Sequence, residues 1–158
     1  MWRVLIAALA LTAGCSAHAQ PSYEDYVKSY TVQGSFDDVR SFVEFAITGR
    51  GMVINNVSHI GNMLSRTGKD IGAKDQVFLQ AEALEFCSAS LSRRMMEADP
   101  LNIVFCPYII AIYVLPDSPG TVHVAFRRPV LLGSPASRAA LADVEKLLDG
   151  IAKEGVGK

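Results

Sequence analysis

Two amphipathic helical segments, one near each end of the chain, constrain the fold more than any other feature of the sequence. The first follows a capping-box pattern at residues 35–38 (SFDD) and ends at Gly49 and Gly51. The second begins at Ser134-Pro135, a capping hydroxyl followed by a proline that the first helical turn tolerates. Their apolar residues recur at helical spacing: Val39, Phe42, Val43, Ala46 and Ile47, then Leu141, Val144, Leu148 and Ile151. Each helix has one apolar face, and we expect the C-terminal helix to pack on the sheet of its own domain.

Five segments beside and between these helices have the composition of β-strands. They span residues 26–33, 52–57, 77–87, 107–114 and 122–126, and the fourth is almost wholly apolar, as in a central buried strand. Short helices are expected at 60–67 and after Ser88 or Ser90, the second ending at Asp99-Pro100. The order strand, long helix, four strands with helical insertions, long helix predicts an α+β domain. In it, both long helices cover one face of an antiparallel sheet, and the other face is polar, covered by an insertion or an oligomer contact.

The first nineteen residues have the pattern of an export signal. Arg3 precedes an apolar run at residues 4–13, which is shorter than the roughly 20 residues of a membrane-spanning helix. Ala17-His18-Ala19 fits a small-x-small cleavage site, so we expect a signal peptide at 1–19 and a periplasmic protein. The alternative is a lipid anchor at Cys15, because residues 12–15 (TAGC) resemble a lipobox. Cleavage after Ala19 would leave a mature chain with a core at 20–133 and a C-terminal helix at 134–158 packed on the same domain.

The net charge of the chain and the absence of known catalytic motifs argue against several classes of function. The chain has 15 Lys and Arg against 16 Asp and Glu, a formal net charge of −1, whereas a nucleic-acid-binding domain is normally basic. The glycine-rich phosphate loops and the signatures of zinc proteases, serine hydrolases, thioredoxins and c-type haem proteins are absent. We therefore expect no nucleic-acid partner and favour a binding protein over an enzyme. The doublets Arg93-Arg94 and Arg127-Arg128 are either anion-binding residues or solvated surface charge.

Cys87 and Cys106 form the most informative pair of residues. Cys87 ends the third predicted strand and Cys106 precedes the fourth, so antiparallel pairing of these strands would place both thiols at one edge of the sheet. Parallel pairing would separate them by a strand length, ~20 Å, and forbid a bond. In an oxidising compartment the pair predicts a structural disulfide. A redox-active or persulfide-carrying pair and inert buried thiols are the alternatives.

His59 is the third candidate site residue. It lies where the second predicted strand meets a short helix, and with the two cysteines it would complete a three-ligand metal or haem site. The commoner role of such a histidine is to cap a helix or to bond a backbone carbonyl. The sequence identifies no cofactor.

From about residue 26 to residue 129 the chain resembles domain-of-unknown-function family 302, a group of small bacterial and archaeal domains. The resemblance rests on the opening at 35–38, the segment 51–54 (GMVI), His59, the segment 85–88 (EFCS), Asp99-Pro100 and the strand from Pro107 to Tyr113. Two departures stand out: Ser88-Ala89 replaces an Asn-Pro pair, and Cys106 precedes Pro107 instead of following a proline. The resemblance implies a TATA-binding-protein-like fold, in agreement with the predicted order, and implies no activity.

Together these features predict an exported domain that binds a small ligand or a protein partner, with Cys87 and Cys106 as a structural pair. A thiol-based redox or sulfur-handling protein that uses the same two cysteines is the alternative function. A metal or haem protein that also uses His59 is a weaker one. Attachment to a membrane is expected only if Cys15 is lipidated, and a homo-oligomer is compatible with the fold.

Overall fold

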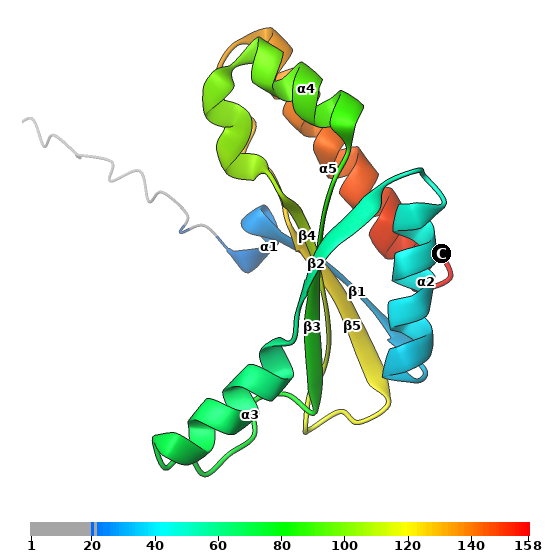
Figure 1. The fold of residues 1–158 in the computed structure, drawn as a ribbon, viewed down its shortest axis with the longest axis vertical. Helices are drawn as coiled ribbons and strands as arrows, with labels where there is room; N and C mark the ends of the chain where they lie inside the picture. Colours follow the sequence, from blue (N-terminus) through cyan, green and yellow to red (C-terminus); the bar gives the residue numbers. More distant parts are fainter. Residues whose placement is uncertain (1–19, 21) are drawn as a thin grey trace, which may run out of the picture.

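A five-stranded antiparallel sheet forms the centre of the molecule, which is represented by a computed structural model that describes residue 20 and residues 22–158. Its strands are β1 (Val27–Gln33), β2 (Val53–Ser58), β3 (Gln80–Cys87), β4 (Tyr108–Val114) and β5 (Thr121–Arg127). Their order across the sheet is β1-β5-β4-β3-β2, and every neighbouring pair is antiparallel (Figure 1). The predicted α+β class and the antiparallel sheet are confirmed. The predicted signal peptide at 1–19 lies outside the described residues.

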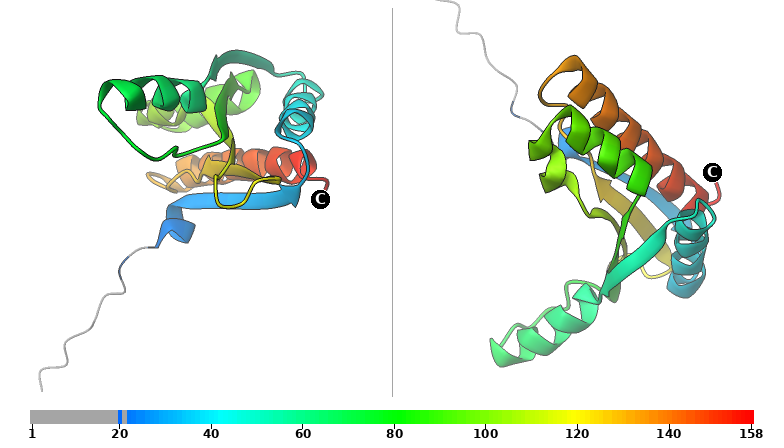
Figure 2. Two further views of the ribbon diagram at one scale, coloured as in Figure 1. Left: turned by 90° about the horizontal axis from the view of Figure 1, so that it is seen from below. Right: turned by 45° about the horizontal axis from the view of Figure 1, so that its top comes forward.

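The two long helices lie side by side against one face of the sheet (Figures 1 and 2). These are α2 (Phe36–Thr48) and α5 (Pro135–Gly155), and each starts at its predicted serine cap. Ser35 Oγ accepts the Asp38 amide at 3.1 Å, and Ser134 Oγ accepts the Ser137 amide at 3.1 Å. The predicted apolar face of α5 is buried at Leu141, Val144, Leu148 and Ile151. The terminal helix therefore packs on its own domain, as expected.

The segments inserted between β2 and β3 and between β3 and β4 form short helices at opposite ends of the sheet. Helix α4 (Ala89–Ala98) packs on α5 and leads into the 3₁₀ helix η1 (Pro100–Phe105), whereas α3 (Ile60–Asp70) follows β2, contacts β3 and projects outward (Figures 1 and 2). None of the helices in the described part of the chain has both the length and the apolar character needed to cross a membrane.

Two short elements differ from the prediction, helix α3 extends three residues beyond its predicted end at residue 67, and strand β3 starts three residues late. The helix α1 (Tyr23–Tyr26) was not expected, and neither was η1. The Asp99-Pro100 pair ends α4 as predicted but also starts η1, because the Asp99 carboxylate accepts the Leu101 amide at 3.0 Å. Strand β3 starts at Gln80 instead of residue 77, since Phe78 lies in the preceding connection with its ring packed edge-on against Tyr113.

The core lies between the sheet and the helices. Alternate residues of β4 and β5 face the helices and are buried: Tyr108, Ile110, Ile112 and Val114, and Val122, Val124 and Phe126. On the opposite face, Ala83, Ala111 and Ala125 are in register across β3, β4 and β5, next to the stacked rings of Tyr113 and His123. Small side chains at these positions leave space above the sheet.

Candidate functional site

The pairing of β3 with β4 brings Cys87 and Cys106 together. Phe86 pairs with Tyr108 at the end of the ladder, so Cys87 at the end of β3 lies beside the residues that lead into β4. Both cysteines are free thiols and half-buried, and their Sγ atoms are 3.5 Å apart. The sulfur atoms of a disulfide are about 2.05 Å apart. The two sulfur atoms are therefore close together but not bonded.

A serine and a tyrosine extend the thiol pair into a network. Ser92 Oγ on α4 lies 3.2 Å from Cys106 Sγ and 3.2 Å from Tyr108 Oη. Burial and the hydrogen bond with Cys106 raise the pKa of the Cys87 thiol. Burial also raises the pKa of Tyr108 to about 12. Because the thiolate is the reactive form of cysteine, this environment disfavours nucleophilic chemistry at Cys87 near neutral pH.

His59 lies far from the two cysteines. It follows Ser58, which pairs with Ala83, whereas Cys87 pairs with Val53 at the other end of the same two strands. Five to six residues of strand separate His59 from the cysteines, roughly 15–20 Å. The three-ligand metal or haem site with His59 is therefore not formed. Within residue 20 and residues 22–158, no three His, Cys, Asp or Glu side chains gather to hold a metal ion.

His59 instead occupies the N-cap position of α3, and its side chain contacts Glu82 rather than capping the helix. Its Nδ1 lies 2.8 Å from Glu82 Oε1, and the other oxygen of Glu82 accepts a hydrogen bond from Arg40 Nε at 2.6 Å. These contacts connect the start of α3 with β3 and α2. These contacts give His59 a structural role.

A cavity of about 300 Å³ opens where the sheet divides between β4 and β5. The two strands pair only as far as Ile110 and Phe126. Beyond that point β5 continues alongside β1, with Arg127 opposite Val27, while β4 continues alongside β3. Beyond Ile110 and Phe126, β4 is therefore paired only with β3, and β5 only with β1. Side chains line the gap that opens between β4 and β5.

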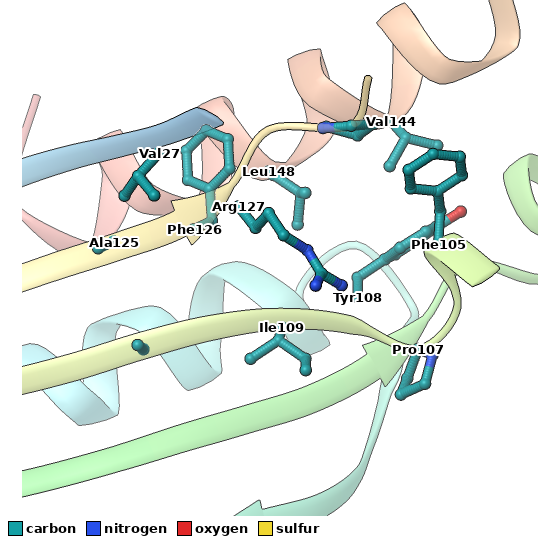
Figure 3. Close-up of a pocket in the computed structure, with 12 residues that line it drawn as sticks. Val27, Phe105, Pro107, Tyr108, Ile109, Ala125, Phe126, Arg127, Val144 and Leu148 are labelled. Atoms are coloured by element: carbon teal, nitrogen blue, oxygen red, sulfur yellow. The ribbon is translucent and has the colours of Figure 1, made fainter. Parts of the chain in front are cut away.

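The walls of the cavity are apolar and come from distant parts of the chain (Figure 3). The sheet contributes Val27, Tyr108, Ile109, Ala111, Ala125, Phe126 and Arg127, the flanking segments contribute Phe105, Pro107 and Pro129, and α5 contributes Val144 and Leu148. Arg127 is the one charged residue among these, and its side chain extends from β5 across the gap toward Tyr108 and Ile109 (Figure 3). Tyr108 belongs to both the cavity and the thiol network, so the two features share a wall.

A fold of this kind can leave a groove under its C-terminal helix, but the sequence does not indicate which residues line it. The cavity residues were assigned to strands and to a helix, and their meeting at one point depends on where the β4–β5 pairing stops. One signal was present in the doublet Arg127-Arg128, which was open to an anion-binding role. The structure separates the two arginines: Arg128 pairs with Glu145 at 2.7 Å, whereas Arg127 lines the cavity. Arg93 and Arg94 pair with Glu97 and Asp143, respectively.

The sequence and the fold are both similar to those of a known family. The sequence profile of "Domain of unknown function DUF302" matches residues 28–155, and no curated protein matches the chain. The crystal structure of an uncharacterized conserved protein DUF302 from Bacillus stearothermophilus is similar, with a TM-score of 0.67 and 18% sequence identity. The match covers 81% of this chain and 96% of that chain. At this identity the similarity shows a shared fold.

Proposed function

The chain belongs to the DUF302 family of domains of unknown function. We propose that the protein is an exported domain that binds a small ligand. The binding site is the cavity between β4 and β5, and the Cys87/Cys106 pair is a structural disulfide in the exported protein. The cavity is the observation that carries this proposal.

The size and chemistry of the cavity support binding of a small molecule. Its volume of about 300 Å³ is at the lower end of the range for ligand pockets, ~300–1,000 Å³. Ligand pockets typically combine apolar walls with a few polar groups that orient the ligand. Here the apolar walls surround Arg127 and the hydroxyl-bearing Tyr108. The floor residues Val144 and Leu148 belong to the rigid helix α5.

The surroundings of the thiols support a structural pair. The 3.5 Å separation of the sulfur atoms lets a bond form between residues that the sheet already holds in place. Formation of the bond removes two protons and two electrons from the thiols, which a disulfide oxidant of an oxidising compartment accepts. The raised pKa of Cys87 favours this role over that of a reactive thiolate. The export signal proposed at 1–19 would deliver the chain to such a compartment.

The ligand-binding proposal is tested by filling the cavity. Ala111 lines it and is only half-buried, so Ala111→Leu adds volume inside the cavity without removing a polar contact. The probe is 1-anilinonaphthalene-8-sulfonate, titrated by fluorescence into protein purified from the periplasm after expression of the full chain. We expect Ala111→Leu to weaken probe binding at least tenfold, because the added methyl groups occupy the volume that the probe needs.

Ala139→Leu, an exposed change on α5, is the matched control and should bind the probe as the unchanged protein does. Circular dichroism and thermal unfolding check that both variants are folded. Equal binding by Ala111→Leu and the unchanged protein would contradict the assignment of the site to this cavity.

The role of the cysteines is tested by thiol trapping in periplasmic extracts with a maleimide reagent, followed by intact mass. We expect Cys87 and Cys106 to be fully oxidised and to resist mild reductant, because the folded domain holds both sulfur atoms within reach of each other. The mass also reports whether the chain is cleaved after Ala19 or lipidated at Cys15. A pair that cycles between thiol and disulfide, or that carries added sulfur, would replace the structural role with the redox or sulfur-handling function.

A further inference from the structure

We propose that the ligand of the β4–β5 cavity is an apolar molecule with one anionic group, such as a carboxylate or a sulfonate, and that Arg127 binds this group. This inference rests on the proposed function and names the chemical class of its ligand. It follows from the single positive charge among the lining residues, from the lack of a salt bridge at Arg127 in the described part of the chain, and from the exposed apolar residues next to the lining residues.

The cavity is positively charged at one point. Of the twelve residues that line it, Arg127 is the only one with an ionisable charge at neutral pH, and none is acidic. The Tyr108 hydroxyl stays protonated at neutral pH because burial raises its pKa to about 12. Figure 3 shows the Arg127 guanidinium directed across the gap, away from its own strand. The charged group that a ligand in the cavity meets is therefore the Arg127 guanidinium.

Arg127 lacks the carboxylate partner that the other arginines near this end of the sheet have. Arg128 pairs with Glu145, Arg94 with Asp143 and Arg93 with Glu97, whereas no salt bridge in the described part of the chain involves Arg127. Two carboxylates on neighbouring elements, one on α5 and one on β3, have other partners. Glu145 is bound to Arg128 at 2.7 Å, and Glu85 accepts hydrogen bonds from Asn56 at 3.1 Å and Ser58 at 3.0 Å.

A guanidinium beside apolar walls selects an anion. Its planar donors match the two oxygens of a carboxylate, and exclusion of water by the ligand strengthens the charge-assisted hydrogen bonds. A cationic ligand of the same shape is repelled, and a neutral one gains only ordinary hydrogen bonds. The exposed position of Arg127 keeps the guanidinium hydrated in the empty site, so no internal partner is needed.

Two exposed apolar residues neighbour lining residues in the chain. Val104 precedes the lining residue Phe105 and is 67% exposed, and Val130 follows the lining residue Pro129 and is 44% exposed. Exposed apolar side chains that adjoin a pocket extend the surface on which an apolar ligand can lie. The ligand body is therefore an alkyl or aryl group, which can extend past the mouth.

The charge preference is tested with three probes of equal chain length: decanoate, decanol and decylamine. Calorimetric titration uses the protein purified from the periplasm after expression of the full chain. We expect decanoate to bind at least tenfold more tightly than decanol, and decylamine to bind most weakly. Octanoate should bind more weakly than decanoate, by about fourfold for each methylene lost from the cavity.

The role of Arg127 is tested by Arg127→Gln, which should reduce the affinity for decanoate to that for decanol. Arg66→Gln on the projecting helix α3 is the matched control and should change neither affinity. A second measurement on the unchanged protein does not depend on any variant: added salt should weaken binding of decanoate and leave binding of decanol unchanged.

The outcomes separate this inference from the proposed function. Equal affinity for decanoate and decanol, or unchanged selectivity in Arg127→Gln, overturns the anionic ligand, while loss of binding in Ala111→Leu still supports the cavity as the site. If the unchanged protein binds neither these probes nor the fluorescent probe, the proposed function fails and the inference fails with it.

Discussion

At the scale of single residues, the polar side chains of this domain act in small networks in which one carboxylate serves several donors. Asp149 on α5 is the clearest case, because it accepts hydrogen bonds from Tyr30 Oη, from Lys28 Nζ at 2.6 Å and from Lys153 Nζ at 2.9 Å. Partial burial tends to raise the pKa of this carboxyl, but the hydrogen bonds from its three partners outweigh burial and lower the pKa well below its usual range. Asp149 thereby connects β1 to α5.

The lowered pKa of Asp149 makes its contribution to stability depend on pH. A group with a lowered pKa in the folded state stabilises the protein above its unfolded pKa, about 3.9 for aspartate, and this stabilisation is lost as the pH falls through the folded pKa. We expect Asp149→Asn to reduce the free energy of unfolding by about 1–2 kcal/mol at pH 7. The difference should shrink steadily below about pH 4.

Urea denaturation of both proteins between pH 7 and pH 2.5 measures this difference. Asp117→Asn is a suitable control, because Asp117 lies in the exposed turn between β4 and β5. A difference between Asp149→Asn and the unchanged protein that stays constant with pH would show that the carboxylate charge does not stabilise the fold.

At the scale of elements, the close packing of α2 on α5 depends on a glycine. A Cβ atom at Gly155 would lie 2.3 Å from Val43 Cγ2 on α2, whereas a Cβ atom at Gly150 would meet only the end of the flexible Arg50 side chain at 3.8 Å. Both glycines belong to α5, but only Gly155 is at a contact between the two helices. The helices approach this closely because Gly155 has no side chain.

These two glycines predict opposite effects of alanine. Gly155→Ala should reduce the free energy of unfolding by about 1–3 kcal/mol, because the added methyl group overpacks the contact with Val43. Gly150→Ala should increase it by about 0.5–1 kcal/mol, because the site has room and alanine favours the helix. Thermal unfolding of the two variants measures both effects. The same sign for both would contradict the packing described here.

At the scale of the whole molecule, the proposed disulfide and the proposed binding site belong to one structural unit. The separation of 19 residues between Cys87 and Cys106 contains α4 and η1, and η1 ends at the cavity residue Phe105. A bond between the cysteines would close this segment and restrict the unfolded chain, for a stabilisation of about 3 kcal/mol in the loop-entropy model. The wall of the cavity would gain rigidity from the same bond.

The sequence by itself determined the long helices and the five strands, because their signals are local. The caps at Ser35 and Ser134, the helical spacing of Leu141 to Ile151 and the apolar run of β4 each predicted an element that is present. An antiparallel sheet followed from these elements as the simplest arrangement in which both long helices cover one face, whereas the strand order β1-β5-β4-β3-β2 came from the structure. The proximity of Cys87 and Cys106 depended only on the antiparallel pairing of β3 with β4.

The tertiary structure alone decided the cavity and the place of His59. The cavity exists because pairing of β4 with β5 stops at Ile110 and Phe126 while each strand continues beside another partner. That stop depends on contacts among residues far apart in the chain, which leave no periodic pattern in the sequence. A metal-ligand role for His59 beside the cysteines was the weaker alternative to helix capping or a backbone contact, and the strand register excludes it by placing His59 at the opposite end of β2. A local pattern reports which face a residue occupies, and only the paired sheet determines which distant residues it meets.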